Sequence, residues 1–233
     1  MLKLVLSMLL ITTALFAESK DALEAFKKKD YEVAFKLYEK SAKAGDTTAQ
    51  NALSYLYFNG LGISKDADKG LVWLQKAANS SDARAQNDLG MMYLTGRNIK
   101  QDSKSAFKWL TKASDAKNSN AQFNLALMYY RGDVADQNVS KTAELLEKSA
   151  LQGNKLAEKN VGLVYMQLIK FDKAAFWLEK NAANGDEKAY YLLAEIYCEA
   201  EKFKKAKKWA QKSKDSGNKD AQLLWSKYNL EKY

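Results

Sequence analysis

The sequence has no histidine and no proline among its 233 residues, and Cys198 is its only cysteine. Histidine is the usual general base and a frequent zinc ligand, so its absence argues against hydrolytic and zinc-dependent enzymes. Without proline, no helix interior is interrupted by a residue that lacks a backbone N–H. A lone cysteine has no internal partner, so we expect a semi-buried, inert thiol. An intermolecular disulfide or redox site is the alternative.

Basic residues outnumber acidic ones, and the formal net charge is +9. The lysines are spread along the chain, and their densest run extends from Lys202 to Lys208. We interpret the excess as a solvated basic face and expect no nucleic-acid ligand. Association with an anionic surface, such as a membrane or cell wall, is the alternative. Charged residues make up 28% and hydrophobic residues 47%, which indicates a folded rather than a disordered chain.

Met1 to Ala17 has the layout of a secretory signal peptide, with one lysine before an apolar run. The run from Leu4 to Phe16 is too short to span a bilayer. We predict cleavage between Ala17 and Glu18, and therefore a periplasmic or secreted bacterial protein. Leu15 occupies a position where alanine is preferred, and a buried first helix is the alternative. No cysteine follows the run, so we expect no lipid anchor.

An alanine, usually followed by glutamine, recurs along the chain at intervals of 36 residues and then of 32. These pairs are Ala49-Gln50, Ala85-Gln86, Ala121-Gln122, Ala157-Glu158, Ala189-Tyr190 and Ala221-Gln222. Self-similarity at such a period predicts a repeat protein in which each unit is one helix pair. The shorter interval indicates that four residues are missing from the loop within a pair.

The first helix of each unit has an apolar stripe that ends in tyrosine. Its members are Leu53, Leu89, Leu125, Val161 and Leu193, with Tyr57, Tyr93, Tyr129, Tyr165 and Tyr197 four residues later. Residues four apart share a helix face, so we expect this face to be buried. A small residue follows each stripe residue and should let a neighbouring helix approach. Gly60, Gly96 and Gly132 are predicted to end these helices in a left-handed conformation.

The second helix of each unit has a bulky residue three positions before a lysine. The bulky residues are Trp73, Trp109, Leu145, Trp177 and Trp209, and the lysines are Lys76, Lys112, Lys148, Lys180 and Lys212. A lysine near a helix C-terminus favours the helix dipole, so we interpret this column of lysines as structural. A basic binding ridge is the alternative.

The pattern A-Q-x-x-L-G-x-x-Y-x-x-G followed by K-A-x-x-W-x-x-K-A resembles the Sel1-like repeat, a relative of the tetratricopeptide repeat. The resemblance extends from about Lys20 to Tyr233. It implies an all-α fold, a right-handed α-solenoid of helix pairs. We expect a signal peptide at 1–17, a capping repeat at 18–48, three full repeats at 49–156, two shorter tetratricopeptide-like repeats at 157–220 and a closing helix at 221–233.

The resemblance also implies a binding surface, because tetratricopeptide-type arrays hold ligands in a concave groove lined by first helices. The implied positions are Asn51, Tyr55, Phe58, Asn87, Met91, Leu94, Phe123, Leu127, Tyr130, Lys159, Leu163, Met166, Tyr191 and Glu195. An amide side chain both donates and accepts, so Asn51 and Asn87 suit a peptide backbone. Packing against the adjacent unit is the alternative for each position.

Cysteine-rich secreted relatives are often labelled β-lactamases, but this chain lacks the cysteine pair that joins the two helices of each unit there. Serine β-lactamase chemistry needs Ser-x-x-Lys with supporting motifs. That spacing occurs at Ser114–Lys117 and Ser216–Lys219, in predicted turns, without Ser-Asp-Asn or Lys-Thr-Gly. We therefore expect no catalytic residue, metal or cofactor. The predicted function is a non-enzymatic envelope adaptor that binds a protein or peptide; a β-lactam- or peptidoglycan-fragment-binding protein with β-lactamase-like activity is the alternative.

Asn138 lies in Asp136-Gln137-Asn138-Val139-Ser140, which contains the Asn-x-Ser acceptor sequence for N-glycosylation. The segment also resembles the extended acidic acceptor of bacterial oligosaccharyltransferases. We expect it in the loop between the two helices of the third full unit, where a glycan would not disturb packing. A chance occurrence of the motif is the alternative.

The signal-peptide prediction can be tested on the protein recovered from its native host. The intact mass should correspond to a chain that begins at Glu18, because cleavage is predicted after Ala17. A mass that includes the first 17 residues would instead support a membrane-tethered scaffold.

Overall fold

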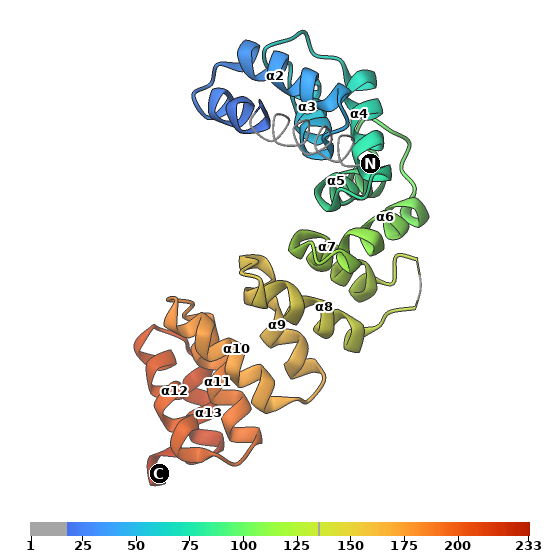
Figure 1. Ribbon diagram of the computed structural model, residues 1–233. Coiled ribbons are helices and arrows are strands. Elements are labelled where there is room, and N and C mark those ends of the chain that lie inside the picture. The colour runs from blue at the N-terminus through green and yellow to red at the C-terminus, as the bar shows by residue number, and fades with distance from the viewer. Residues whose placement is uncertain (1–17, 135) are drawn as a thin grey trace, which may run out of the picture. The chain divides into compact units, whose positions relative to one another are not determined.

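The computed structural model describes residues 18–134 and 136–233, and all regular secondary structure in those ranges is helical (Figure 1). Residues 18–27 form the first described helical segment. The helices that follow are α2 (Tyr31–Lys43), α3 (Thr47–Asn59), α4 (Ala67–Asn79), α5 (Ala83–Thr95), α6 (Ser103–Asp115), α7 (Ser119–Arg131), α8 (Val139–Leu151), α9 (Lys155–Gln167), α10 (Phe171–Ala183), α11 (Lys188–Glu199), α12 (Phe203–Asp215), α13 (Asp220–Lys227) and the 3₁₀ helix η1 (Leu230–Lys232). None of the described helices is long and apolar enough to cross a membrane. The predicted signal segment lies outside the described residues.

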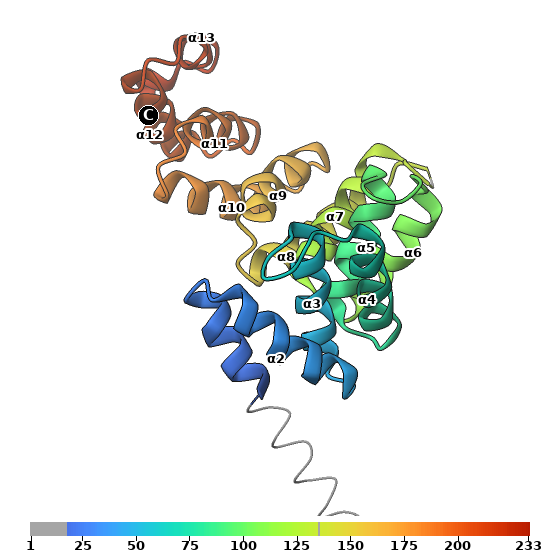
Figure 2. The ribbon, with the colours of Figure 1, turned by 90° about the horizontal axis from the view of Figure 1, so that it is seen from above.

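The chain divides into two compact units, residues 1–121 and 122–233. In the first unit, α2 packs on α3, α3 on α4, α4 on α5 and α5 on α6 (Figure 2). In the second unit, contacts between sequence neighbours run from α8 to α12, and α13 packs on α11 and α12. Within each unit, these helices thus pack against their neighbours in sequence, as expected of a repeat array.

The loops within the helix pairs have two lengths, as the spacing predicts. Seven residues separate α3 from α4, α5 from α6 and α7 from α8, whereas three separate α9 from α10 and α11 from α12. Gly60, Gly96 and Gly132 have φ values of 66°, 72° and 73°, which confirms their predicted left-handed conformation. Every loop closes with one hydrogen bond from the residue before the second helix to the stripe tyrosine carbonyl. The donors are Asp66, Asp102, Asn138, Lys170 and Lys202, at 2.8–3.0 Å.

The small residues beside the stripe allow close helix contacts. A Cβ atom added to Gly90 would lie 2.8 Å from Leu110 Cγ of α6, and one added to Gly162 would lie 2.9 Å from Leu178 Cγ of α10. Both distances are shorter than a Cβ contact normally allows. The leucine of the second helix therefore occupies the space that a side chain on the first helix would need, as predicted.

The recurring Ala-Gln pair joins each unit to the one before it. Ala49, Ala85 and Ala121 are completely buried in helix contacts. The Gln50 amide donates to the Ala42 carbonyl at 3.2 Å, and Gln86 donates to the Ala78 carbonyl at 3.1 Å. These carbonyls lie in the last turns of α2 and α4 and also accept from Gly45 N and Ser81 N, at 3.1 and 3.2 Å. The glutamine thus adds a second hydrogen bond at the end of the preceding second helix.

Acidic and amide side chains begin most of the helices, a feature that the repeat pattern did not reveal. The side-chain oxygens of Asp30, Asp46, Asp66, Asp82, Asp102, Asn138 and Asn154 accept hydrogen bonds from the first-turn N–H groups of α2, α3, α4, α5, α6, α8 and α9. Such caps typically stabilise a helix by about 1 kcal/mol. In the short units, Lys170 and Lys202 stand at this position and provide no side-chain cap.

The segment 221–233 consists of α13 and η1 rather than one continuous helix. Asn229 has a φ of 48°, and asparagine tolerates this left-handed conformation better than most residues. The turn returns Leu230 to a completely buried position and stacks Tyr233 on Phe203, with ring centroids 4.7 Å apart. The last helix is therefore shorter than predicted, and the turn after it covers the end of α12.

Gly62 and Gly45 provide a matched test of close backbone contact, because both have positive φ values of 70° and 101°. A Cβ atom on Gly62 would lie 2.0 Å from the Tyr31 carbonyl oxygen, whereas one on Gly45 would meet nothing within 4 Å. Gly45→Ala should cost only the left-handed strain, about 1 kcal/mol. Gly62→Ala should cost about 3 kcal/mol more, through overpacking against backbone. Urea unfolding of both variants measures the difference; equal losses would contradict this assignment of the contact.

Candidate functional site

Some of the predicted groove residues gather in a hollow of the first unit. This hollow has a volume of about 780 Å³ and is lined by Ser19, Leu23, Phe26, Tyr38, Thr48, Asn51, Ala52, Tyr55, Asp82, Ala83 and Arg84. The rings of Phe26 and Tyr55 meet edge to face with centroids 6.0 Å apart, and Tyr55 is exposed. The hollow therefore presents an aromatic wall formed by the first described helical segment and α3.

The polar side chains of the first hollow differ in whether they already form hydrogen bonds or salt bridges within the protein. Asp82 caps α5 by accepting from Ala85 N at 2.8 Å, so its role is structural. Arg84 is exposed and has no salt bridge to any residue in the described ranges. Burial raises the pKa of Tyr38, which keeps its hydroxyl protonated at neutral pH. The half-buried Asn51 thus lies next to an aromatic surface and to one positively charged side chain, Arg84, that forms no salt bridge within the described ranges.

A second hollow, of about 440 Å³, lies in the second unit among α9, α10 and α11. Its lining residues are Lys159, Asn160, Leu163, Leu178, Asn181, Asp186, Lys188, Ala189, Tyr191, Leu192 and Asn218. Leu163 is exposed, and Lys159 and Lys188 are exposed lysines on its border. Burial, followed by the charge of Glu195, raises the pKa of Tyr191. The hollow combines an apolar floor with two lysines and the Asp186 carboxylate, which accepts from Lys188 N at 3.2 Å.

The remaining predicted groove positions line neither hollow. Asn87 is only 8% exposed, and its amide donates to Asp88 Oδ1 at 3.1 Å. Phe58 packs against Gly70, where an added Cβ atom would lie 2.9 Å from its ring. The other positions in this group, all half-buried except the exposed Tyr130, are Met91, Leu94, Phe123, Leu127, Tyr130, Met166 and Glu195. A contact between any of them and a ligand stays a prediction.

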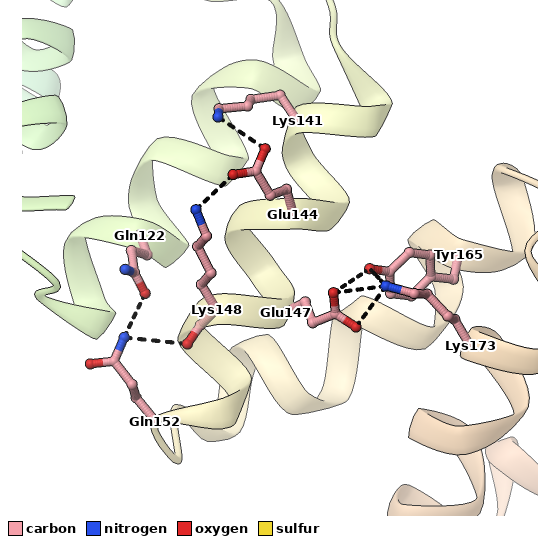
Figure 3. A network of polar contacts seen from close by, with 8 residues as sticks. All are labelled: Gln122, Lys141, Glu144, Glu147, Lys148, Gln152, Tyr165 and Lys173. Carbon is pink, nitrogen blue, oxygen red and sulfur yellow. Dashed lines mark hydrogen bonds and ion pairs between the residues drawn. The ribbon is translucent and has the colours of Figure 1, made fainter. Parts of the chain in front are cut away.

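The stripe tyrosines of the second unit bind glutamates of the preceding second helix. Tyr165 donates to Glu147 at 2.8 Å, and Lys173 Nζ lies 3.0 Å from the same carboxylate (Figure 3). Although burial acts in the opposite direction, hydrogen bonds from Lys173 and Tyr165 lower the pKa of Glu147. Tyr197 makes the same contact with Glu179 at 2.8 Å, one repeat later. Because the same tyrosine–glutamate hydrogen bond recurs, we interpret it as a structural contact between consecutive repeats rather than as part of a catalytic site.

The column of lysines lies over the tryptophan rings of the second helices. The Nζ atoms of Lys76, Lys112, Lys180 and Lys212 are 4.9, 4.5, 5.2 and 4.8 Å from the ring centroids of Trp73, Trp109, Trp177 and Trp209. Where the ring is replaced by Leu145, Lys148 instead pairs with Glu144 at 2.7 Å (Figure 3). These four lysines therefore form cation–π contacts with the tryptophan rings, in addition to their favourable interaction with the helix dipole. The Trp-x-x-Lys spacing was the sequence signal for this contact.

Cys198 is 1% exposed, and burial raises its pKa to about 11. Only the thiolate reacts readily, so burial and the raised pKa both disfavour reaction of this thiol, which is more deeply buried than predicted. Ser114 is buried, and the Ser216 hydroxyl donates to the Ser213 carbonyl at 2.9 Å. Within the described ranges, no group of three His, Cys, Asp or Glu residues gathers in a way that could hold a metal ion.

Asn138 stands at the junction of the loop and α8 rather than within the loop alone. Its side-chain oxygen accepts from Lys141 N at 2.8 Å, the same contact that Asp66 makes with Lys69 N at 2.9 Å in α4. Asn138 is exposed, and Ser140 already belongs to the first turn of α8. The helix cap accounts for an Asn or Asp at this position, and glycosylation of Asn138 stays a prediction.

Glu158 occupies the position of the recurring glutamine and has a different role. It is 4% exposed, and its carboxylate lies 2.8 Å from Lys180 Nζ and 2.9 Å from Lys155 Nζ. Hydrogen bonds from Lys180 and Lys155 lower its pKa. The carboxylate therefore joins the start of α9 to α10 through a charged contact.

Comparison with known proteins matches most of the chain to one family. The segments 23–46, 47–82, 83–118, 119–154, 160–186 and 187–218 each match the Sel1 repeat. The crystal structure of a Sel1 repeat protein from Oxalobacter formigenes is 26% identical, with a TM-score of 0.68 over 87% of this chain and 88% of that one. The structure of c5321, a protective antigen present in uropathogenic Escherichia coli strains, is 26% identical, with a TM-score of 0.72 over 92% of this chain and 49% of that one.

A third solved structure, of Pseudomonas aeruginosa pilF, is 17% identical, with a TM-score of 0.56 over 94% of this chain and 98% of that one. It shows likeness of fold alone. No curated protein matches this chain. The matches to solved Sel1 structures confirm the predicted solenoid of helix pairs.

Glu158→Gln should make the stability of the chain less dependent on pH. Because the pKa of Glu158 is lowered by folding, its contribution is present above the ordinary value of 4.5 and is lost as the pH falls through the lowered value. The native chain should therefore unfold at higher urea concentration than the variant at neutral pH, and the gap should close in acid. A gap that is independent of pH would contradict the ion pairs.

Proposed function

Because the chain belongs to the Sel1 repeat family, whose members typically serve as protein-interaction scaffolds, we propose that it is a non-enzymatic adaptor that binds a protein or peptide segment. Repeat arrays offer extended surfaces built from rigid helices, which bind without first having to become ordered. The proposed sites are the two hollows lined by first helices.

The observation that carries this proposal is the aromatic wall of the first hollow beside an amide and a cation. Phe26 and Tyr55 form an apolar surface that suits a side chain of a bound segment. Asn51 is placed to donate to and accept from a peptide group, and Arg84 to pair with an acidic residue or a terminal carboxylate. A few convergent polar groups around an apolar floor are typical of binding sites.

The second hollow supports a related contact. Leu163 and Tyr191 supply apolar surface, and the exposed amines of Lys159 and Lys188 border it. This combination favours a segment with an apolar side chain next to a negative charge. The two hollows belong to different compact units, so each can be tested separately.

We place the adaptor outside the cytoplasm, in the periplasm or beyond. The support is the sequence of residues 1–17, with its single lysine, apolar run and small residue before Glu18. One similar structure is described as a protective antigen of uropathogenic Escherichia coli strains, and this chain spans 49% of it. That description concerns the other protein and supports export here by analogy.

The adaptor proposal is tested by in-cell crosslinking of a tagged chain, capture from the envelope fraction and mass spectrometry. Asn51→Ala with Tyr55→Ala removes the first hollow's contacts, and Leu163→Ala with Tyr191→Ala removes those of the second. At least one pair should reduce capture of a specific partner about tenfold or more, since a central contact typically carries 1–2 kcal/mol or more of binding energy.

The matched control is Val72→Ala with Phe176→Ala, which truncates exposed residues of second helices that line neither hollow. This control should capture as much partner as the native chain, and all variants should keep the native melting temperature within a few degrees. Equal capture by every variant would place the contact elsewhere. If no protein is captured and purified chain hydrolyses nitrocefin, the β-lactam interpretation replaces the adaptor.

A further inference from the structure

One helix of the second unit presents a concentrated positive charge. The exposed side of α12 carries four lysines, all within one face of the helix. These residues, the α12 lysine face, are Lys204, Lys205, Lys208 and Lys212. The buried side of the same helix consists of Ala206, Ala210 and Ser213. The lysines are therefore not needed for packing α12 onto its neighbours.

None of these four lysines forms a salt bridge with a residue in the described ranges. The only acidic residue of α12 is Asp215, its last residue, which accepts from Gln211 at 2.7 Å. The preceding second helix, α10, differs, since its Lys173 and Lys180 pair with Glu147 and Glu158 at 3.0 and 2.8 Å. The charge of the α12 lysine face is thus uncompensated within its own unit.

A small aromatic hollow adjoins the N-terminal end of this face. It has a volume of about 310 Å³ and is lined by Glu201, Lys202, Phe203, Lys204, Lys205 and Tyr233. The stacked rings of Phe203 and Tyr233 form its apolar surface, and Tyr233 is 48% exposed. An apolar, aromatic surface thus lies beside the amines of Lys204 and Lys205 and the Glu201 carboxylate, while Lys202 pairs with Asp172 at 2.9 Å.

We propose that the α12 lysine face and the adjoining hollow bind the surface of an anionic phospholipid membrane. The face extends about 12 Å along the helix axis, which suits several headgroups rather than one small ion. Lysines attract anionic headgroups, while tyrosine and phenylalanine favour the boundary between headgroups and acyl chains. Lysines beside exposed aromatic side chains, here from α12 and the residue after η1, are typical of interfacial membrane contacts.

The aromatic residues nearby argue against single-stranded nucleic acid as the occupant. Binding of that kind stacks bases on open aromatic rings. The Trp209 ring is covered by Lys208 and Lys212, at 5.8 and 4.8 Å from its centroid. The Trp225 ring is covered by Lys207 and Lys214, at 5.7 and 4.3 Å. These two rings contact lysines and leave little open surface for bases, and the exposed Tyr233 offers one ring rather than a series of stacking surfaces.

The test is flotation of the purified chain with phosphatidylcholine vesicles that do or do not contain phosphatidylglycerol. Only the anionic vesicles should bind, and added salt should release the protein because it screens exposed charges. Lys204→Gln, Lys205→Gln and Lys208→Gln together should weaken binding at least about tenfold, since each lysine near an anionic bilayer contributes about fivefold. Lys212 is retained because it contacts two rings, Trp209 and Tyr190. Lys205 and Lys208 each contact only one, Tyr197 at 5.1 Å and Trp209 at 5.8 Å.

Two control variants separate the α12 lysine face from total charge. Replacing the same three lysines by arginine keeps the charge and should keep binding. The α6 variant replaces by glutamine three exposed lysines of α6 and the loop before it that also lack salt bridges within the described ranges, Lys100, Lys104 and Lys108. It leaves Lys112 on the Trp109 ring and should bind as the native chain does.

Several results would overturn the proposal. These are equal binding to neutral vesicles, no binding at low salt, or an equal loss in the α6 variant. Binding to duplex DNA or polyphosphate without binding to vesicles would assign the face to a different polyanion. The proposal concerns a surface separate from the two hollows, so its failure would leave the adaptor proposal unaffected.

Discussion

Close contact between consecutive helices is the constraint on which this structure depends, because one helix pair has too little apolar surface to form a core alone. The contact is possible only where the first helix carries a residue without a bulky side chain, as at Gly90 and Gly162. Leucines of the second helix, such as Leu110 and Leu178, then fill the space. Because interiors pack at nearly crystalline density, this spacing leaves little freedom for the backbone. The recurrence of a small residue at the same position in each repeat follows from this close packing, since each unit must present the same surface to the next.

Polar contacts between neighbouring helices add specificity to this packing. Gln50 donates to a carbonyl at the end of the preceding helix, and Glu158 makes a charged contact at the equivalent position. Tyr165 and Tyr197 bind glutamates of the helix before them. All of these contacts join a helix to one of the next helices in the chain.

Much of the fold followed from periodicity, whereas the candidate sites did not. The intervals of 36 and 32 residues, the stripe and Gly60 each reflect local geometry, which sequence spacing encodes directly. The grouping of Asn51 with Arg84, and the burial of Asn87, depend on how adjacent helices cross, which no spacing within one helix specifies. The cation–π contacts of the lysine column and the cap made by Asn138 were hidden for another reason. The lysines were already explained by the helix dipole, and Asn138 was already part of a glycosylation motif.

The hydrogen bond that closes each loop has a consequence for how such chains change over evolution. The Asp66 amide donates to the Tyr57 carbonyl where seven residues separate the two helices, and the Lys170 amide donates to the Tyr165 carbonyl where three separate them. The same closure thus accepts either length, so the loop can gain or lose residues without altering the register of the helices on either side. Insertions and deletions at these points leave the stacking intact. The packed helix faces are therefore tightly constrained, whereas the loops within the helix pairs are free to change in length and in residue type.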